Sequence, residues 1–273
     1  MRTAYIPFCL LIIGFFSCSK GPIDSVQSNN FPKVDSILGQ YLLNKEVHSS
    51  LYSMNVGSSG YGYFKYDDKN VSKRIGGYIQ IYFPVYSDAI YDTVQYISSD
   101  TILLTTLDNT PDFNIYPDNR KIILGNGLIR MKITYNTFLQ YYNLPGPQPV
   151  DQDTIYYSYD TKNRLSRTVQ HLPNKIVERD YLYDNHDNLL KIMSTIKDSY
   201  PSLYITTATE EFGGYDNKKN PLKGICLWQD LLYRTLSANN FTTYLYREGN
   251  SSSVEYKTWT LVYNSQGEVD FSK

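Results

Sequence analysis

The chain has 273 residues, with 26 Lys and Arg against 27 Asp and Glu, so its formal net charge is only −1. That balance removes any global electrostatic case for binding nucleic acid or an anionic membrane surface. The length suits one all-β domain or two small domains. The most unusual feature is the 28 tyrosines, because tyrosine favours strands and surfaces that are half exposed to water.

Residues 1–17 are predicted to be a signal peptide, because Arg2 precedes an apolar run that is too short to cross a bilayer as a helix. The run ends at Ser17 and Cys18, and a small residue directly before a cysteine resembles the lipobox of bacterial lipoproteins. This resemblance implies that Cys18 carries lipid and, because Ser19 replaces the retaining Asp, that the anchor lies in the outer membrane. The alternative is an ordinary signal peptide with an incidental cysteine.

Residues 18–32 are polar and contain Gly and Pro, so we expect a lipidated N-terminus followed by a tether. Residues 33–273 are predicted to form a single β-rich domain. At its start, helical spacing of apolar residues predicts a short amphipathic helix. The spaced residues are Val34, Ile37, Leu38, Tyr41 and Leu42.

From about residue 59 the apolar pattern has a period of two, which is typical of strands. The strand-like segments, rich in Tyr, Ile, Val and Thr, are residues 60–67, 76–85, 92–99, 100–107 and 121–135. Within the last segment, the Gly-Asn-Gly at 125–127 predicts a hairpin turn. The Pro-rich stretch 143–153 is interpreted as a long hairpin loop, with a domain boundary as the alternative.

A recurring Tyr-Asp phrase predicts the architecture. In one copy Tyr159 ends a strand, Asp160 caps the turn, Asn163 takes the left-handed conformation and Leu165 begins the return strand. We therefore expect residues 164–171 and 175–183 to pair antiparallel, with the Tyr-Asp turns gathered along one rim of the sheet.

The phrase recurs along the chain, with Asn in place of Asp in the last copy. The copies are Tyr66-Asp67, Tyr159-Asp160, Tyr183-Asp184, Tyr215-Asp216, and Tyr263 with Gly267 in the turn. The last four are separated by 24 (183 − 159), 32 (215 − 183) and 48 (263 − 215) residues. Each step is one or two hairpins of chain, so neighbouring hairpins are expected to bury each other's faces.

The segment "YSYDTKNRLSRT" at 157–168 resembles the YD repeats of the Rhs family. The lipobox, these hairpins and the passage "YDNKKNPLKG" at 215–224 followed by "LSANN" at 236–240 resemble a second family more fully. That family comprises lipoproteins of gut Gram-negative anaerobes with a domain of unknown function described as having a porin-like fold. The resemblance implies an antiparallel up-and-down meander, strongly curved or barrel-like, with one or two short helices and no known activity.

Residues 225–238 interrupt the strand pattern with helical spacing. Ile225, Trp228, Leu232 and Leu236 form one apolar face, and Asn239 is predicted to cap the C-terminus. We expect a helical insert whose apolar face covers or plugs the sheet; the alternative is a helix that contacts a membrane. A transmembrane barrel is disfavoured because Glu178, Arg179 and Asp180 put charge on both faces of one strand.

The sequence offers little chemistry. No nucleophile, phosphate-binding or zinc motif is present, and we expect neither a metal nor another cofactor. His48, His171 and His186 are interpreted as solvated residues. The segment "YDNHDN" at 183–188 has oxygen ligands for calcium but not the spacing of a known calcium loop.

Cysteine usage predicts an inert thiol in the mature chain. Cys9 leaves with the signal peptide and Cys18 carries lipid, so Cys226 has no partner for a disulfide. Apolar neighbours favour a buried side chain at Cys226. Asp-Ser/Thr-aliphatic triplets resemble an O-glycosylation sequence used by secreted proteins of these bacteria. They begin at Asp24, Asp35, Asp92, Asp100 and Asp153.

The leading functional hypothesis is a non-catalytic lipoprotein of the cell envelope, either a binding or a structural module. Its expected partners are outer-membrane lipid through Cys18 and an unidentified protein or glycan, with no nucleic acid. A glycan-binding protein needs several tyrosines exposed on one face. The alternatives are a half-open barrel that carries an apolar ligand in a cavity lined by Ile, Leu and Phe, and an unrecognised hydrolase with two carboxylates converging in a cleft.

Overall fold

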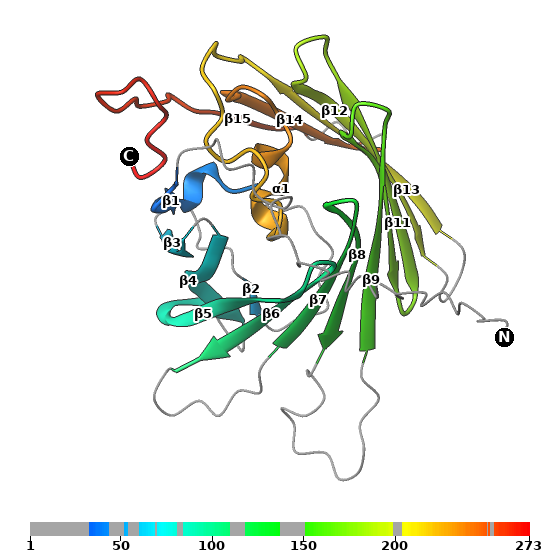
Figure 1. Cartoon of the computed structure of the whole chain (residues 1–273). Coiled ribbons are helices and arrows are strands. Elements are labelled where there is room, and N and C mark those ends of the chain that lie inside the picture. The colour runs from blue at the N-terminus through cyan, green and yellow to red at the C-terminus, as the bar shows by residue number, and fades with distance from the viewer. Residues whose placement is uncertain are drawn as a thin grey trace, which may run out of the picture.

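The computed structural model describes residues 33–43, 52–53, 60–68, 70–80, 84–109, 118–136, 151–198, 204–249, 251 and 254–273. The predicted signal peptide (1–17), Cys18, the tether (18–32) and His48 lie outside the described residues. The described strands form one strongly curved antiparallel sheet that encloses a single short α-helix (Figure 1). The predicted fold class, an all-β up-and-down meander, is confirmed.

The first half of the sheet consists of β1 (Ser36–Leu38), β2 (Tyr52–Ser53), β3 (Tyr61–Asp67), β4 (Asn70–Gln80), β5 (Pro84–Ser98), β6 (Thr101–Asp108), β7 (Asp118–Gly125) and β8 (Leu128–Asn136). The second half consists of β9 (Asp151–Tyr159), β10 (Leu165–Leu172), β11 (Lys175–Tyr183), β12 (Leu189–Asp198), β13 (Tyr204–Gly213), β14 (Thr243–Glu248) and β15 (Val254–Thr258). Each strand pairs with the next along the chain, except that β1 pairs with β3 and the short β2 pairs with β4.

Strand order places the turns after β3, β5, β7, β9, β11 and β13 along one edge of the sheet, which we call the Tyr-Asp rim. The expected pairing of residues 164–171 with 175–183 is confirmed, since β10 and β11 pair from Leu172↔Lys175 to Arg167↔Asp180. The loop interpretation of residues 143–153 also agrees, because β8 pairs directly with β9. Strand β9 already begins at Asp151.

Two predicted boundaries were wrong. The segment 76–85, expected to be one strand, spans the connection between β4 and β5. Pro84 begins β5, and a proline at the first position of a strand removes no inner ladder bond. β5 then continues without a break through the segment 92–99 to Ser98.

The amphipathic helix predicted at residues 34–42 is also wrong. The chain there forms β1 and one turn of 3-10 helix, η1 (Gly39–Tyr41). β1 adds to the exposed edge of β3 in the register Ser36↔Tyr63, and Ile37 is fully buried. Edge pairing with β3 therefore overrides the local helical pattern.

The two edge strands of the sheet, β1 and β15, do not pair with each other. Instead the C-terminal segment, residues 259–273, bonds to the chain around β1 (Figure 1). The Leu38 amide donates to the Phe271 carbonyl at 2.8 Å, the Tyr41 hydroxyl donates to the Lys273 carbonyl at 2.7 Å, and the Trp259 indole donates to the Gln40 carbonyl at 2.7 Å.

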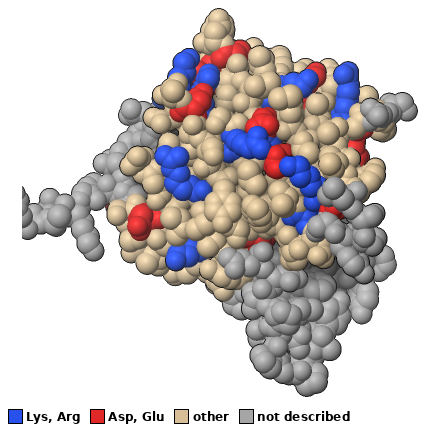
Figure 2. Space-filling model, turned by 90° about the vertical axis from the view of Figure 1, so that its right-hand side faces the viewer, with Lys and Arg blue, Asp and Glu red and all other residues tan. Residues whose placement is uncertain are grey.

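The outer face of the sheet carries charge of both signs over β10–β13 (Figure 2). Arg167 reaches Glu178 at 2.6 Å and Asp180 at 2.8 Å, and Lys197 reaches Glu178 from the other side at 2.5 Å. Hydrogen bonding from Lys197 is the main cause of the lowered pKa of Glu178. Exposed ion pairs of this kind each contribute little to the free energy of unfolding. We therefore interpret the outer face as a solvent-exposed surface and not as a source of stability.

Candidate functional site

The turn at Asp160 shows why the Tyr-Asp phrase makes a hairpin. One carboxylate oxygen, Oδ1, accepts from the amides of Lys162 and Arg164, each at 2.9 Å, and the Asp160 amide donates to the Arg164 carbonyl at 2.9 Å. Asn163 has φ 60°, the left-handed conformation that asparagine tolerates. The backbone amides and the carbonyl of this turn are therefore hydrogen-bonded by residues of the turn itself.

Two further copies repeat this geometry. Asp184 Oδ1 accepts from the amides of His186 and Asn188, each at 2.8 Å. Asn264 Oδ1 does the same for Gln266 and Glu268, with Gly267 at φ 77°. The first copy differs, because Asp67 pairs directly with Asn70 in a tighter hairpin in which Asp68 takes the positive φ of 51°.

The tyrosines of the phrase have a role that the sequence did not predict. Four of them, together with Tyr96, project the hydroxyl across the rim to a backbone carbonyl at or near the start of a neighbouring strand and thereby join neighbouring hairpins. The fifth, Tyr263, donates instead to Asp216 Oδ2 at 2.9 Å. We call Tyr66, Tyr96, Tyr159, Tyr183 and Tyr215 the rim tyrosines; their acceptors are Val34, Val71, Ile129, Leu165 and Leu189. Burial raises the pKa of all five hydroxyls, that of Tyr66 to about 12.

The copy at Tyr215-Asp216 contains the helical insert within its turn. The Asp216 amide donates to the carbonyl of Asn240 at 3.0 Å, and Asp216 Oδ1 accepts from the amides of Lys218 at 3.2 Å and Asn240 at 3.0 Å. Asn240 thus takes the place that Arg164 has in the Asp160 turn. The return comes after 24 residues (240 − 216) instead of four (164 − 160), so 20 extra residues are accommodated inside a capped turn.

Within this insert, which we define as residues 217–239, helix α1 (Gln229–Thr235) is about half as long as the predicted helix over 225–238. Gly224 has φ 92° and Trp228 is extended, so the helix cannot begin earlier. It ends at Leu236, and Asn239, predicted as its cap, instead donates its amide to Asn188 Oδ1 at 2.9 Å. Of the predicted apolar face, Ile225, Trp228 and Leu232 are nonetheless buried and Leu236 is half-buried, which agrees with the plug interpretation and not with a membrane-contacting helix.

Buried polar bonds fix the insert to the concave face of the sheet. Arg74 of β4 and Asp230 form a bidentate ion pair at 2.7 and 2.6 Å, and Arg74 is 0% exposed. The Trp228 indole donates to Asp92 of β5, and the Tyr233 hydroxyl donates to Glu210 of β13 at 3.0 Å. Since these partners lie on the neighbouring strands β4 and β5 and on the distant strand β13, the insert bridges the curve of the sheet.

A cavity of about 250 Å³ lies between the insert and the Tyr-Asp rim, and we call it the rim cavity. Its wall is mainly apolar and aromatic: Leu128, Ile129, Tyr157, Tyr159, Leu165, Tyr183, Leu232 and Leu236. The charged residues that line it are Lys162, Arg164, Asp187 and Lys223. Predicted turn residues Tyr159, Asn163 and Tyr183 thus meet here, whereas Tyr66, Asp67, Tyr263 and Gly267 do not line it.

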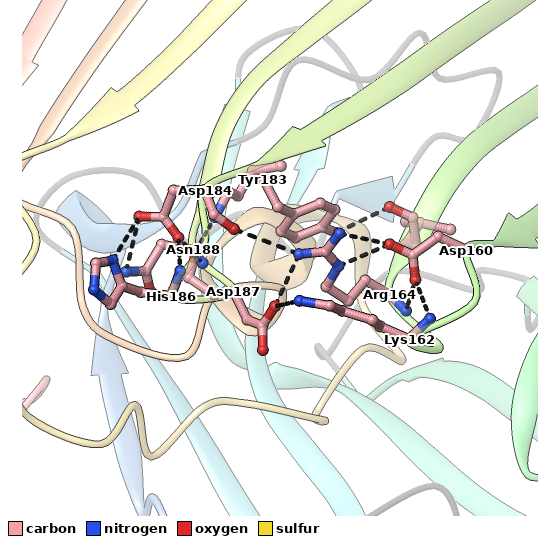
Figure 3. A network of polar contacts seen from close by, with 11 residues as sticks. Asp160, Lys162, Arg164, Tyr183, Asp184, His186, Asp187 and Asn188 are labelled. Atoms are coloured by element: carbon pink, nitrogen blue, oxygen red, sulfur yellow. Dashed lines mark hydrogen bonds and ion pairs between the residues drawn. The ribbon is translucent and has the colours of Figure 1, made fainter.

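An ion network crosses the rim beside the cavity (Figure 3). The Arg164 guanidinium lies between the carboxylates of Asp160, at 2.7 Å, and Asp187, at 2.8 Å, and 4.7 Å from the Tyr183 ring centre. Lys162 adds a longer pair with Asp187 at 3.4 Å. Burial opposes ionisation of both Asp160 and Asp187, yet both pKa values are lowered. At Asp160 the Arg164 and Lys162 amides and the Arg164 guanidinium outweigh burial, and at Asp187 the Lys162 and Arg164 side chains do.

Cys226 also lines the rim cavity, and it is half-buried, whereas its sequence neighbours predicted a buried side chain. Its thiol packs against the core, and burial raises its pKa to about 11. A thiol with this pKa is almost entirely protonated at neutral pH and is a poor nucleophile. We therefore interpret Cys226 as part of the cavity wall and not as a catalytic nucleophile.

Other candidate residues from the sequence have structural explanations. In the segment considered for calcium, Asp184 caps its turn and Asp187 pairs with Arg164. His171 and His186 are exposed. Of the aspartates that begin modification triplets, Asp92 and Asp153 are buried inside the sheet, and Asp24 lies outside the described residues.

The sheet is similar to that of a porin-like protein. The crystal structure of that protein, from Bacteroides vulgatus ATCC 8482, has a TM-score of 0.50 and 12% sequence identity, and the match covers 87% of this chain and 90% of that one. A porin-like protein from Bacteroides uniformis ATCC 8492 has a TM-score of 0.49 at 12% identity, covering 88% of each chain. At such identity the likeness concerns the fold alone.

No family model matches the chain, and no curated protein matches it. In the part of the chain that the structure describes, no helix is both long enough and apolar enough to cross a membrane.

The rim cavity could not be found from the sequence. Its lining comes from five separate elements, and Lys223, Cys226 and Leu232 reach it only because the insert is closed by Asn240. The nearest sequence signal is Asn240, the second Asn of "LSANN", because it closes the turn that begins at Asp216. In the Asp160 turn the closing residue comes only four residues after the aspartate.

Proposed function

We propose that this protein is a non-catalytic binding protein of the cell envelope and that the rim cavity is its ligand site. The observation that carries the proposal is the cavity itself, a half-open and mainly apolar space of about 250 Å³ between the rim and a well-anchored insert. Concave, mostly apolar spaces with a few placed polar groups are the usual form of small-molecule sites.

The character of the wall favours binding over catalysis. The hydroxyls of Tyr159 and Tyr183 are committed to backbone carbonyls at 2.8 and 3.0 Å. Asp187 is the one carboxylate in the described lining, and it is paired with Arg164. The hydrolase alternative needs two converging carboxylates, whereas the described lining has one. The apolar carrier needs a dry cavity lined by Ile, Leu and Phe, whereas this lining has no Phe and includes four charged residues.

Ligand occupancy can be tested on protein purified from its native envelope. Native mass spectrometry should detect a small molecule bound to the wild-type chain. Cys226→Phe, which fills the cavity, should remove that molecule, whereas the near-isosteric Cys226→Ser should retain it. Retention of the same ligand by Cys226→Phe, in a folded protein, contradicts the proposed site.

We also propose that lipid on Cys18 holds the protein at the outer membrane. Support comes from the signal-like residues 1–17 and the lipobox-like Ser17-Cys18. Cys18→Ala should move the protein from the membrane fraction to the soluble fraction and abolish incorporation of labelled palmitate. Unchanged fractionation and labelling would show that another feature retains it.

A second candidate is glycan binding at Tyr61 and Tyr63 on β3. Both side chains are exposed, and their rings stack with centroids 5.9 Å apart. Aromatic faces of this kind can pack on sugar rings. Among the residues that the structure describes, the other exposed tyrosines lie on distant elements: Tyr156, Tyr204, Tyr256 and Tyr263. A glycan array should show binding that Tyr61→Ala and Tyr63→Ala remove and Tyr256→Ala leaves intact.

A further inference from the structure

We propose that the rim cavity takes a small amphiphile with one anionic end, whose apolar body lies against the cavity wall and whose charge pairs with Lys223. The inference rests on the proposed function, because it names the ligand class of the same site. It follows from three features of the cavity: which polar groups of the wall are already bonded, which charges at its edge are already neutralised, and how large the cavity is.

Most of the wall offers the ligand carbon surface. The Tyr159 and Tyr183 hydroxyls point to the carbonyls of Ile129 and Leu165 and leave only their rings for contact. Leucines from two sides complete the surface, Leu128 from the rim and Leu232 from the insert. A ligand with polar groups along its body would leave them unpaired against this wall, which costs binding energy.

At the edge of the cavity, one cation remains without a counter-charge. Arg164 is held between Asp160 and Asp187, and Lys162 also reaches Asp187. For the Lys223 ammonium, the described residues supply neither an ion pair nor a hydrogen bond. Three cations thus face two carboxylates, and the excess positive charge is at Lys223, on the insert side of the cavity. A monoanionic group placed there gains a charge-assisted bond, whereas an ammonium group is repelled.

The size of the cavity restricts the ligand to a small free molecule. About 250 Å³ lies just below the range of roughly 300–1,000 Å³ that is usual for drug-sized ligands. A membrane lipid with two acyl chains does not fit such a volume. We therefore choose octanoate as the probe, with octanamide as its neutral counterpart and octylamine as its cationic counterpart.

The experiment is a calorimetric titration of the folded Cys18→Ala chain, free of lipid, with each probe. We expect octanoate to bind at least about tenfold more tightly than octanamide, and octylamine more weakly than either. Lys223→Met should weaken octanoate by about tenfold and leave octanamide unchanged. Lys223→Gln should do the same, so the result does not depend on one substitution folding well. Lys65→Met, an exposed lysine on β3 far from the cavity, is the matched control.

The outcomes separate the two proposals. Equal binding of octanoate and octanamide, with loss of both in Cys226→Phe, overturns the anionic end and leaves the cavity as a binding site. Octanoate binding that survives Cys226→Phe overturns the site. If none of the three probes binds at millimolar concentration, the inferred ligand class is wrong. A co-purified ligand displaced by Cys226→Phe would then still support the proposed function.

Discussion

The turns at Asp160 and Asp216 share one capping geometry but differ in what they enclose. In both, the carboxylate Oδ1 accepts two backbone amides and the aspartate amide donates to the returning carbonyl. The first turn returns at Arg164 and encloses three residues, whereas the second returns at Asn240 and encloses the 23 residues 217–239. The cap therefore depends on the aspartate and the returning backbone and tolerates a long insertion between them.

The comparison also shows how a simple hairpin sheet acquires a cavity. The Asp160 turn supplies Lys162, Asn163 and Arg164 as one side of the rim cavity, and the insert in the Asp216 turn supplies the opposite side. Neighbouring copies are tied together, because the Ala238 amide donates to the Asp187 carbonyl at 3.1 Å. The same Tyr-Asp turn, short at Asp160 and extended by the insert at Asp216, therefore supplies two opposite sides of the cavity.

Excising the insert should have the largest effect. If residues 217–239 are replaced by Thr-Lys-Asn, as in residues 161–163, the Asp216 turn can still close at Asn240. The excision removes Trp228, Leu231 and Leu232, and the apolar surface of the sheet that packed on them becomes exposed. We therefore expect loss of the near-ultraviolet circular dichroism signal and strong binding of a hydrophobic dye.

The matched control is the same Thr-Lys-Asn exchange for residues 185–187 in the Asp184 turn, which has no insert. That variant should keep the near-ultraviolet spectrum of the wild type. A cooperatively folded excision variant with near-wild-type stability would contradict the role of the insert as part of the core.

Removing one member of the ion pair that anchors the insert should come next. Asp230→Ala leaves the Arg74 guanidinium buried without its counter-ion, which we expect to lower the free energy of unfolding by about 3–5 kcal/mol. Urea denaturation measures the change. The double variant Arg74→Met/Asp230→Leu should lose much less, and a double variant as unstable as the single one would show that shape, not charge, holds the insert.

The two caps should differ in strength. Asp160→Ala removes bonds within one short turn, and we expect a cost of about 1 kcal/mol, by analogy with helix caps. Asp216 additionally accepts from the Asn240 side chain at 3.0 Å and the Tyr263 hydroxyl at 2.9 Å. Asp216→Ala should therefore cost about 2 kcal/mol and increase hydrogen exchange in the insert. Equal costs with unchanged exchange would mean that the cap does not hold the insert in place.

The smallest expected effect concerns the rim tyrosines at high pH. Burial raises the pKa of Tyr66 to about 12 from its ordinary value near 10, so the folded state favours the protonated hydroxyl. The stability that this hydroxyl contributes is fully present below pH 10 and is lost as the pH rises to 12. Tyr66→Phe should lose about 1 kcal/mol at pH 8 and show a flatter decline between pH 10 and 12 than the wild type. Parallel declines would assign the alkaline loss to other groups.

The sequence was sufficient for the hairpins because their information is local. Asp160, Asn163 and Leu165 each act within a few residues of one another, and the period-two pattern then determines which face is buried. The short helix was located for the same reason, since Trp228 and Leu232 show its apolar face.

The remaining features depend on partners far away in the sequence. The pairing of β1 with β3 overrides a helical pattern around Ile37, and the ion pair of Arg74 with Asp230 joins residues 156 positions apart. The acceptors of the rim tyrosines lie on neighbouring hairpins, and nothing in a Tyr-Asp dipeptide specifies them. The rim cavity depends on all of these contacts at once.

The most direct test of the account is a crystal structure of the protein saturated with octanoate. We predict difference density inside the rim cavity, with the alkyl chain between Leu128 and Leu232 and the carboxylate within hydrogen-bonding distance of the Lys223 Nζ. An empty rim cavity at saturation, or octanoate bound only elsewhere on the molecule, would contradict the assignment of this cavity as the ligand site.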